Sequence, residues 1–169
     1  MTSDLGAPNE LDPALRLRAG QVRYGANWQG TAIKMQYERL ATNMQVDPEQ
    51  PVLDSLRLHM QALVDLDFLI TSIRRLLRVA EQARRLGLDR DRRLKLAIKV
   101  FSSHWQPYFV DIRNTLEHVD KPGLPIGPFR GGGKVAFSCP GGEVDATELY
   151  NAAMGLHRAI CQVIEPFET

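Results

Sequence analysis

The segment at residues 111–120, DIRNTLEHVD, contains an arginine, an amide and a histidine at Arg113, Asn114 and His118. Histidine titrates near neutral pH and can accept or donate a proton, whereas arginine stays charged and its planar guanidinium matches phosphate oxygens. A neighbouring amide can orient either group. Cleavage of RNA by its own 2′-hydroxyl needs proton transfer at two oxygens and a cation that stabilises charge on the phosphorane. These three residues therefore predict phosphodiester chemistry that requires neither a metal ion nor another cofactor.

The pattern Arg-Asn-x-x-x-His at 113–118, at the end of a long helical segment, resembles the motif of ribonucleases in the HEPN superfamily of helical-bundle proteins. The similarity in helical patterning covers about residues 12–121 and 145–167. The resemblance implies an endoribonuclease in which Arg113 holds the scissile phosphate, His118 transfers protons and Asn114 orients them. The products would carry 2′,3′-cyclic phosphate ends. It further implies a defence or toxin role, with an antitoxin or another regulatory protein as a partner.

Helix geometry constrains how these residues can act together. Five residues of an ideal helix turn through about 500°, which leaves Arg113 and His118 about 140° apart, whereas Asn114 and His118 share a face. Either the helix ends or unwinds near Glu117, or a second subunit completes the site. The family resemblance favours the second arrangement, because two motifs then meet across a dimer two-fold. We therefore expect a homodimer with an isologous interface along the third helix.

A structural interpretation of the same residues stays open. Arg113 and Glu117 are four residues apart and fit a surface ion pair, while His118 near a helix C-terminus is favourable for the helix dipole. Some toxin members carry a modified tyrosine two residues after the histidine, but Asp120 is found here. Glu117 and Asp120 also put negative charge beside the histidine, which repels a phosphate. The alternative function is a non-catalytic HEPN-like module that binds RNA, a nucleotide or another protein.

Composition limits the class of protein. With 169 residues, 44% hydrophobic and 24% charged, the chain is expected to form one soluble globular domain over 1–169. No apolar run is long enough for a membrane span, and residues 1–9 lack the features of a secretory signal, so a cytoplasmic protein is expected. Cys139 and Cys161 cannot build a disulfide framework and lack zinc-ligand spacing. A net charge of +1 argues against a protein that simply coats nucleic acid.

The charge is unevenly distributed. Residues 71–99 contain ten basic and three acidic side chains, a local charge of +7, which leaves −6 for the remainder. One end of the molecule is therefore expected to be electropositive. If the fold brings it near the motif, five arginines of this segment are predicted to guide the RNA backbone: Arg84, Arg85, Arg90, Arg92 and Arg93. A solvated corner between two helices fits the same residues equally well.

Apolar residues at helical spacing predict four helices. The first begins at Asp12-Pro13 and runs to Met44, and the second begins at Val52 and is capped by Gly87. The third begins at Asp89 or Asp91 and stops at Lys121-Pro122-Gly123, and Pro107 is expected to kink it near Ser103. The last opens with an Asp145–Glu148 capping box and reaches Phe167. Residues 1–11 form a loose tail, and 122–144 predict a loop and a short β-hairpin. The expected fold is all-α, an antiparallel bundle of four to five helices with a small hairpin insert before the last helix.

One further pair has metal-ligand residue types. His157 and Cys161 are four apart on the last predicted helix. No second pair with matching spacing accompanies them, so we expect a packed helix face and no metal site.

Overall fold

The computed structural model describes residues 12–44, 52–117, 128–131, 134–139 and 142–167, so the predicted tail at 1–11 lies outside the described part. The elements follow in the order α1 (Pro13–Asn43), α2 (Val52–Arg85), α3 (Arg93–Glu117), β1 (Pro128–Gly131), β2 (Lys134–Cys139), β3 (Gly142–Asp145), α4 (Ala146–Ile164) and the 3-10 turn η1 (Glu165–Phe167). The predicted all-α bundle with a small β insert before the last helix is confirmed, with four helices in the described part of the chain.

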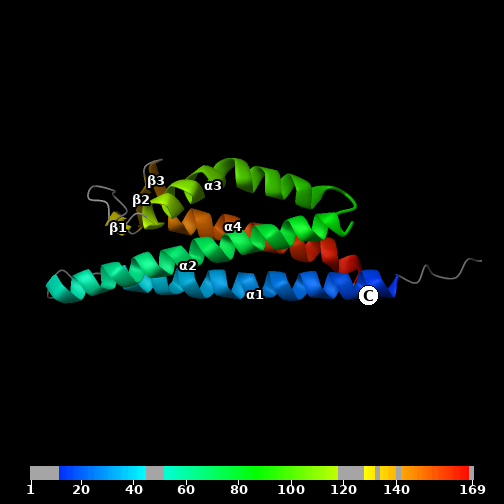
Figure 1. Cartoon of the computed structure of the whole chain (residues 1–169), viewed down its shortest axis with the longest axis horizontal. Helices are drawn as coiled ribbons and strands as arrows, with labels where there is room; N and C mark the ends of the chain where they lie inside the picture. Colours follow the sequence, from blue (N-terminus) through cyan, green and yellow to red (C-terminus); the bar gives the residue numbers. More distant parts are fainter. Residues whose placement is uncertain (1–11, 45–51, 118–127, 132–133, 140–141, 168–169) are drawn as a thin grey trace, which may run out of the picture.

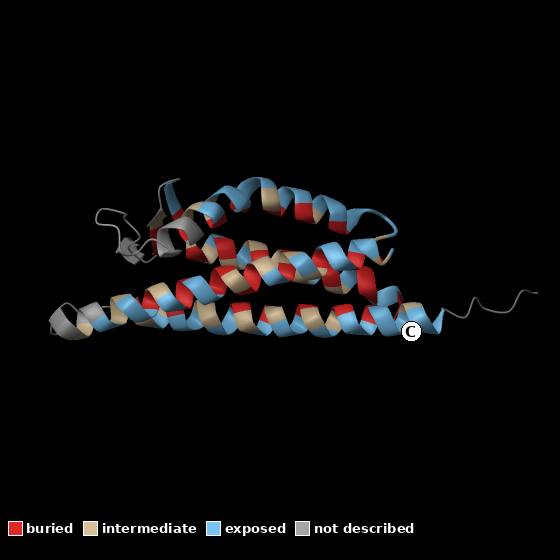
Figure 2. Ribbon diagram, viewed as in Figure 1, coloured by how far each residue is buried: buried red, intermediate tan, exposed pale blue. Residues whose placement is uncertain are grey.

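Two long helices form the base of the molecule. Figure 1 shows α1 and α2 as an extended antiparallel pair, with α4 packed along it and α3 on the side of α4 away from α1. The core lies where the four apolar faces meet, seen as the buried faces in Figure 2. On α4 and η1 the apolar residues at helical spacing are all buried: Leu149, Ala153, Leu156, Ile160, Val163 and Phe167.

The helical spacing of the apolar residues Phe101, Trp105 and Ile112 would place position 108 on the inner face of α3. Tyr108 is nevertheless only half-buried, and Phe109 is buried instead. Positions 108 and 109 lie on either side of the apolar row, so either residue can turn towards the core. Phenylalanine is favoured there, because a buried tyrosine hydroxyl would need a hydrogen-bond partner. The helix continues through Pro107 and is arched in Figure 1, as expected where a proline removes one backbone hydrogen bond.

The insert forms three antiparallel strands in the order β1-β2-β3. The expected hairpin is present, since Phe137 of β2 lies opposite Val144 of β3. Strand β1 was not predicted, because Pro128 and Gly131 at its ends are both poor strand formers. Val135, Phe137 and Val144 are buried and extend the core under the end of the bundle.

Side chains and glycine cap the helices much as predicted. The Asp12 carboxylate accepts a hydrogen bond from the Ala14 amide at 2.9 Å, and Asp145 accepts from Thr147 and Glu148 amides at 2.7 and 3.1 Å. Gly87 has the left-handed φ of +75° that ends α2. Asp89 accepts two amide hydrogen bonds at the start of α3. Local residues therefore determine where α1, α3 and α4 begin and where α2 ends.

Small residues let α1 approach α4 closely. The buried face of α1 includes Ala19, Ala26 and Gly30. A Cβ added at Gly30 would lie 2.8 Å from Cδ2 of His157 on α4, closer than real Cβ contacts allow. Gly20, by contrast, has nothing within 4 Å of such a Cβ. The glycine at position 30 is therefore required by packing, whereas the one at position 20 is not.

This contrast gives a matched pair of substitutions. Gly20→Ala is expected to stabilise the protein by about 0.5–1 kcal/mol, because alanine loses less backbone entropy in a helix. Gly30→Ala is expected to destabilise it by about 1–3 kcal/mol, because the His157 ring must move. Urea denaturation of both variants measures the difference. Equal stabilisation by the two alanines would contradict the packing described for the α1–α4 contact.

Candidate nucleic-acid interface

The motif predicted to be catalytic falls at the end of α3. Arg113 and Asn114 belong to the last described turn of this helix, whose described part runs to Glu117. Their side chains, and the whole of His118, lie outside the described residues. The structure therefore gives the backbone position of Arg113 and Asn114.

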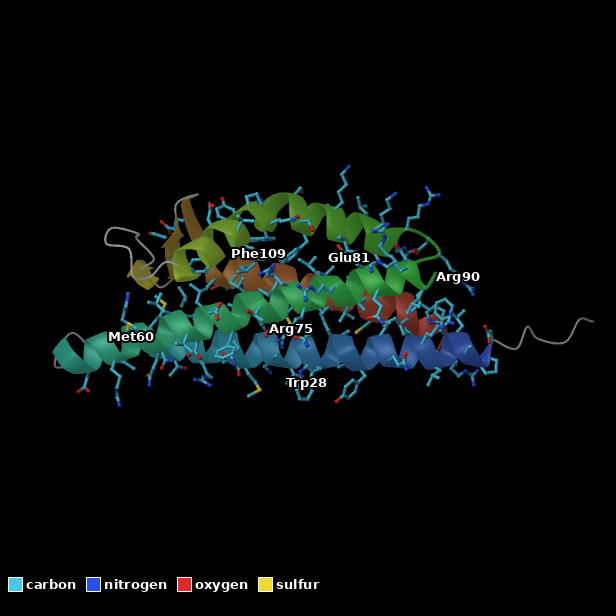
Figure 3. All side chains as sticks on the ribbon, viewed as in Figure 1. Trp28, Met60, Arg75, Glu81, Arg90 and Phe109 are labelled. Atoms are coloured by element: carbon cyan, nitrogen blue, oxygen red, sulfur yellow. The ribbon has the colours of Figure 1, made fainter. Side chains whose placement is uncertain are left out.

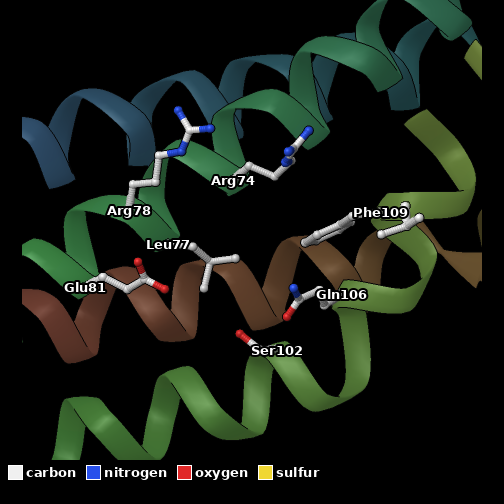
Figure 4. Close-up of a pocket in the computed structure, with 8 residues that line it drawn as sticks. Arg74, Leu77, Arg78, Glu81, Ser102, Gln106 and Phe109 are labelled. Atoms are coloured by element: carbon white, nitrogen blue, oxygen red, sulfur yellow. The ribbon is translucent and has the colours of Figure 1, made fainter. Parts of the chain in front are cut away.

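A pocket lies between α2 and α3, and its α3 residues precede the motif along the helix. It has a volume of about 220 Å³. Figure 4 shows Arg74, Leu77, Arg78 and Glu81 of α2 along one wall, with residues of α3 opposite. The lining from α3 consists of Ser102, Gln106, Phe109 and Val110.

The lining combines charge with hydrogen-bonding groups. Arg74 is half-buried and Arg78 is exposed, and both line the pocket from the α2 wall. Ser102 and Gln106 offer a hydroxyl and an amide from the other wall. Arginines on one wall and neutral polar groups on the other are residue types that suit phosphate and ribose oxygens. Glu81 at the same wall limits the net positive charge.

The α3 wall continues in helical register into the motif. Gln106, Phe109 and Val110 are followed at Arg113 by the next position of the same face. Arg74 and Arg78 belong to the basic segment at 71–99, and the sequence alone assigns them no role. Their i, i+4 spacing marks them as one helix face, but only the packing of α3 beside α2 reveals the pocket.

The predicted RNA-guiding arginines lie at the opposite end of α3. Arg93 begins this helix and Arg113 follows 20 positions later, which corresponds to about 30 Å of helix. Figure 3 shows Arg90 at the end of the bundle where α2 turns into α3. The fold therefore does not bring this turn beside the motif of the same chain.

Several arginines of this turn have partners within the protein. The Arg90 guanidinium lies over the Phe167 ring, 4.7 Å from its centroid. Arg93 pairs with Asp91 at 2.6 Å, and Arg85 pairs with Glu81 at 3.5 Å. Arg84 and Arg92 are exposed, and Arg92 has the left-handed φ of +62°. The turn is thus partly a structural corner, the alternative that the sequence left open.

Three helices also carry exposed apolar rows, and on α2 the row consists of Met60, Val64 and Phe68. On α3, Leu96 and Val100 are 63% and 61% exposed, and Val110 is exposed one turn before Asn114. On α1, Leu17, Tyr24, Trp28 and Met35 are exposed on the side away from the core. Figure 3 shows Trp28 on that outer side. Such rows are candidate contact surfaces for another protein chain.

A second polar cluster joins α1 to α4. His157 Nε2 lies 3.2 Å from Asn27 Oδ1 and 3.7 Å from Cys161 Sγ. Burial lowers the pKa of His157 below its usual 6.5, and the positive charges of Arg23 and Arg158 lower it further. Both effects favour the neutral form of the imidazole.

Comparison of the chain with protein-family models, curated proteins and solved structures finds no match. Among the described residues, no helix is both long and apolar enough to cross a membrane.

The lowered pKa of His157 predicts how stability depends on acid. Because the folded state disfavours the imidazolium, the unfolded chain binds more protons as the pH falls below about 6.5. The contribution of His157 is present above that pH and is lost as the pH falls. We expect the free energy of unfolding to decrease from pH 7 to pH 5.5 more steeply in the wild type than in His157→Gln. Equal slopes in the two proteins would contradict the effect of burial on His157.

Proposed function

We propose that the chain is a metal-independent endoribonuclease of the HEPN type that binds RNA in the pocket between α2 and α3 and cleaves it at the motif that ends α3. The observation that carries the proposal is the register of α3: the face that lines the cationic pocket continues to Arg113. A toxin or defence role, and an antitoxin or regulatory partner, stay predictions of the resemblance.

Each residue has a defined part in the proposed reaction. Arg74 and Arg78 bind phosphates next to the cleaved one, and Arg113 binds the scissile phosphate. The 2′-hydroxyl attacks phosphorus, losing its proton to a base, while the bond to the 5′-oxygen breaks and that oxygen gains a proton. His118 performs proton transfer and Asn114 orients the groups. The products are a 2′,3′-cyclic phosphate and a 5′-hydroxyl end.

The proposed enzyme is a homodimer that joins two motifs. The exposed apolar row on α3 supports an interface along this helix, since Val110 is one turn from Asn114. An isologous contact on this face would bring both copies of α3 together. The arginine-rich turn then binds RNA that extends beyond the pocket, through the exposed Arg84 and Arg92.

A binding module without catalysis is the second candidate. The pocket supports it specifically, because its described lining has two arginines but no histidine, and a single carboxylate at Glu81. A phosphate-bearing ligand would bind there without being cleaved. The two functions share the pocket and differ in whether His118 is needed.

Cleavage of labelled RNA in EDTA tests the chemistry. We expect His118→Ala and Arg113→Ala to lower the rate about 10²–10⁴-fold, because proton transfer and phosphate stabilisation are lost. Arg78→Ala should weaken RNA binding and lower its salt dependence, with a smaller effect on the rate of bound substrate. Arg75→Ala, on α2 but outside the pocket lining, is the matched control. Circular dichroism confirms that each variant is folded.

Two outcomes would separate the candidates. RNA that binds through Arg78 but is not cleaved by the wild type supports the binding module. Cleavage products that end in a 3′-hydroxyl would exclude the proposed mechanism, because internal attack must leave the phosphate on the 2′ and 3′ oxygens.

The composite site is tested by its interface and by mixing. Val100→Glu should give monomers in light scattering and abolish cleavage, because it puts a charge into the proposed α3 contact. Trp28→Glu, at a residue 62% exposed on α1, should leave the dimer intact. A dimer lost in Trp28→Glu but kept in Val100→Glu would move the interface to α1.

Mixing two inactive variants tests whether one centre uses both chains. A composite centre takes its arginine from one copy and its histidine from the other. In a mixed dimer of Arg113→Ala and His118→Ala, one of the two centres therefore keeps both residues and the other loses both. Exchange of subunits should therefore restore part of the activity. Mixed dimers that stay inactive would show that each chain supplies its own arginine and histidine.

A further inference from the structure

Three potential metal ligands from two helices meet on the α1–α4 side of the bundle. Asn27 comes from α1, and His157 and Cys161 come from successive turns of α4. The three distances are 3.2 Å from His157 Nε2 to Asn27 Oδ1, 3.7 Å from His157 Nε2 to Cys161 Sγ, and 3.9 Å from Cys161 Sγ to Asn27 Oδ1. The sequence shows only the histidine and the cysteine as a pair, and Asn27 is far from both along the chain.

These distances resemble the edges of a metal-centred tetrahedron. Zinc bonds of about 2.0–2.1 Å to nitrogen or oxygen and about 2.3 Å to sulfur imply ligand-to-ligand edges of about 3.4–3.6 Å at tetrahedral angles. The observed triangle differs from this by a few tenths of an ångström along each side. Small side-chain rotations would suffice to place all three atoms around one ion.

We propose that Asn27 Oδ1, His157 Nε2 and Cys161 Sγ bind one divalent transition-metal ion of the Zn²⁺ type, with water as the fourth ligand. Nitrogen and thiolate ligands favour such ions over Mg²⁺ or Ca²⁺. The exposed position of Asn27 leaves room for the water. Within the described residues no three His, Cys, Asp or Glu side chains gather, and this site instead takes an amide oxygen as its third ligand.

The surroundings determine the charge of the site. Arg23 donates a hydrogen bond to the Cys161 carbonyl oxygen at 3.4 Å, and Arg23 and Arg158 both act electrostatically on His157. They favour a neutral ring, whose nitrogen lone pair a metal requires, but they also repel a cation. Loss of the thiol proton on binding offsets this repulsion, because the thiolate contributes one negative charge. Gly30 makes the site possible by giving the His157 ring space against α1.

The site is separate from the proposed RNA pocket, since it lies between α1 and α4 and shares no residue with the α2–α3 lining. Its ion would fasten two helices to each other. Metal binding and RNA cleavage can therefore succeed or fail independently.

Titration of the full, EDTA-treated and desalted chain with Co²⁺ tests the proposal. We expect one equivalent of Co²⁺ to bind and to produce a thiolate-to-cobalt charge-transfer band in the near ultraviolet. The band should disappear in Cys161→Ser and remain in Cys139→Ser, the matched control at the other cysteine. His157→Gln should weaken binding by about tenfold or more, Asn27→Ala should weaken it less, and Zn²⁺ should displace the cobalt.

The result that would overturn the site is equally direct. A wild-type chain that shows no charge-transfer band, or a band that persists in Cys161→Ser, would leave the three atoms as a hydrogen-bonded cluster in which the His157 ring donates to Asn27. An affinity for Co²⁺ that is unchanged in Asn27→Ala would overturn the assignment of the third ligand. Circular dichroism of the serine variant excludes unfolding as the cause of a lost band.

Discussion

The close approach of α1 and α4 at Gly30 is the contact from which the arrangement of the bundle follows. Since this position has no side chain, the His157 ring fits directly against the α1 backbone. Ala19 and Ala26 are also buried on α1, and small residues of this kind permit close helix packing. This contact also determines which polar atoms of α1 face α4, and therefore the geometry at Asn27.

A second consequence is the position of α3. Because α1 occupies one side of α4, α3 packs against the opposite side. The contact between α2 and α3 is less extensive than the contact between α1 and α2. Pro107 arches the helix, and the pocket lies between this arch and α2. The polar lining from Ser102 and Gln106 comes from the same stretch of helix. A proline inside a helix, usually counted as a defect, thus helps to open a space that a ligand can occupy.

Features determined by neighbouring residues were predictable, and features determined by packing were not. Asp12, Gly87 and Asp145 identify helix ends because each acts on backbone groups within a few residues. The pocket and the position of Asn27 depend on helices that are distant in sequence, so periodicity alone could not reveal them. The side chains of the motif lie outside the described residues, and their chemistry remains a prediction.

The outward row on α1 has a spectroscopic consequence. Of the chain's two tryptophans, Trp28 is 62% exposed and stacks on Tyr24, whereas Trp105 is only 6% exposed. Their fluorescence should therefore divide into a component that soluble quenchers reach and one that they do not. Trp28 serves as a natural reporter of whatever covers the outer face of α1, and Trp105 as an internal standard for the integrity of the core.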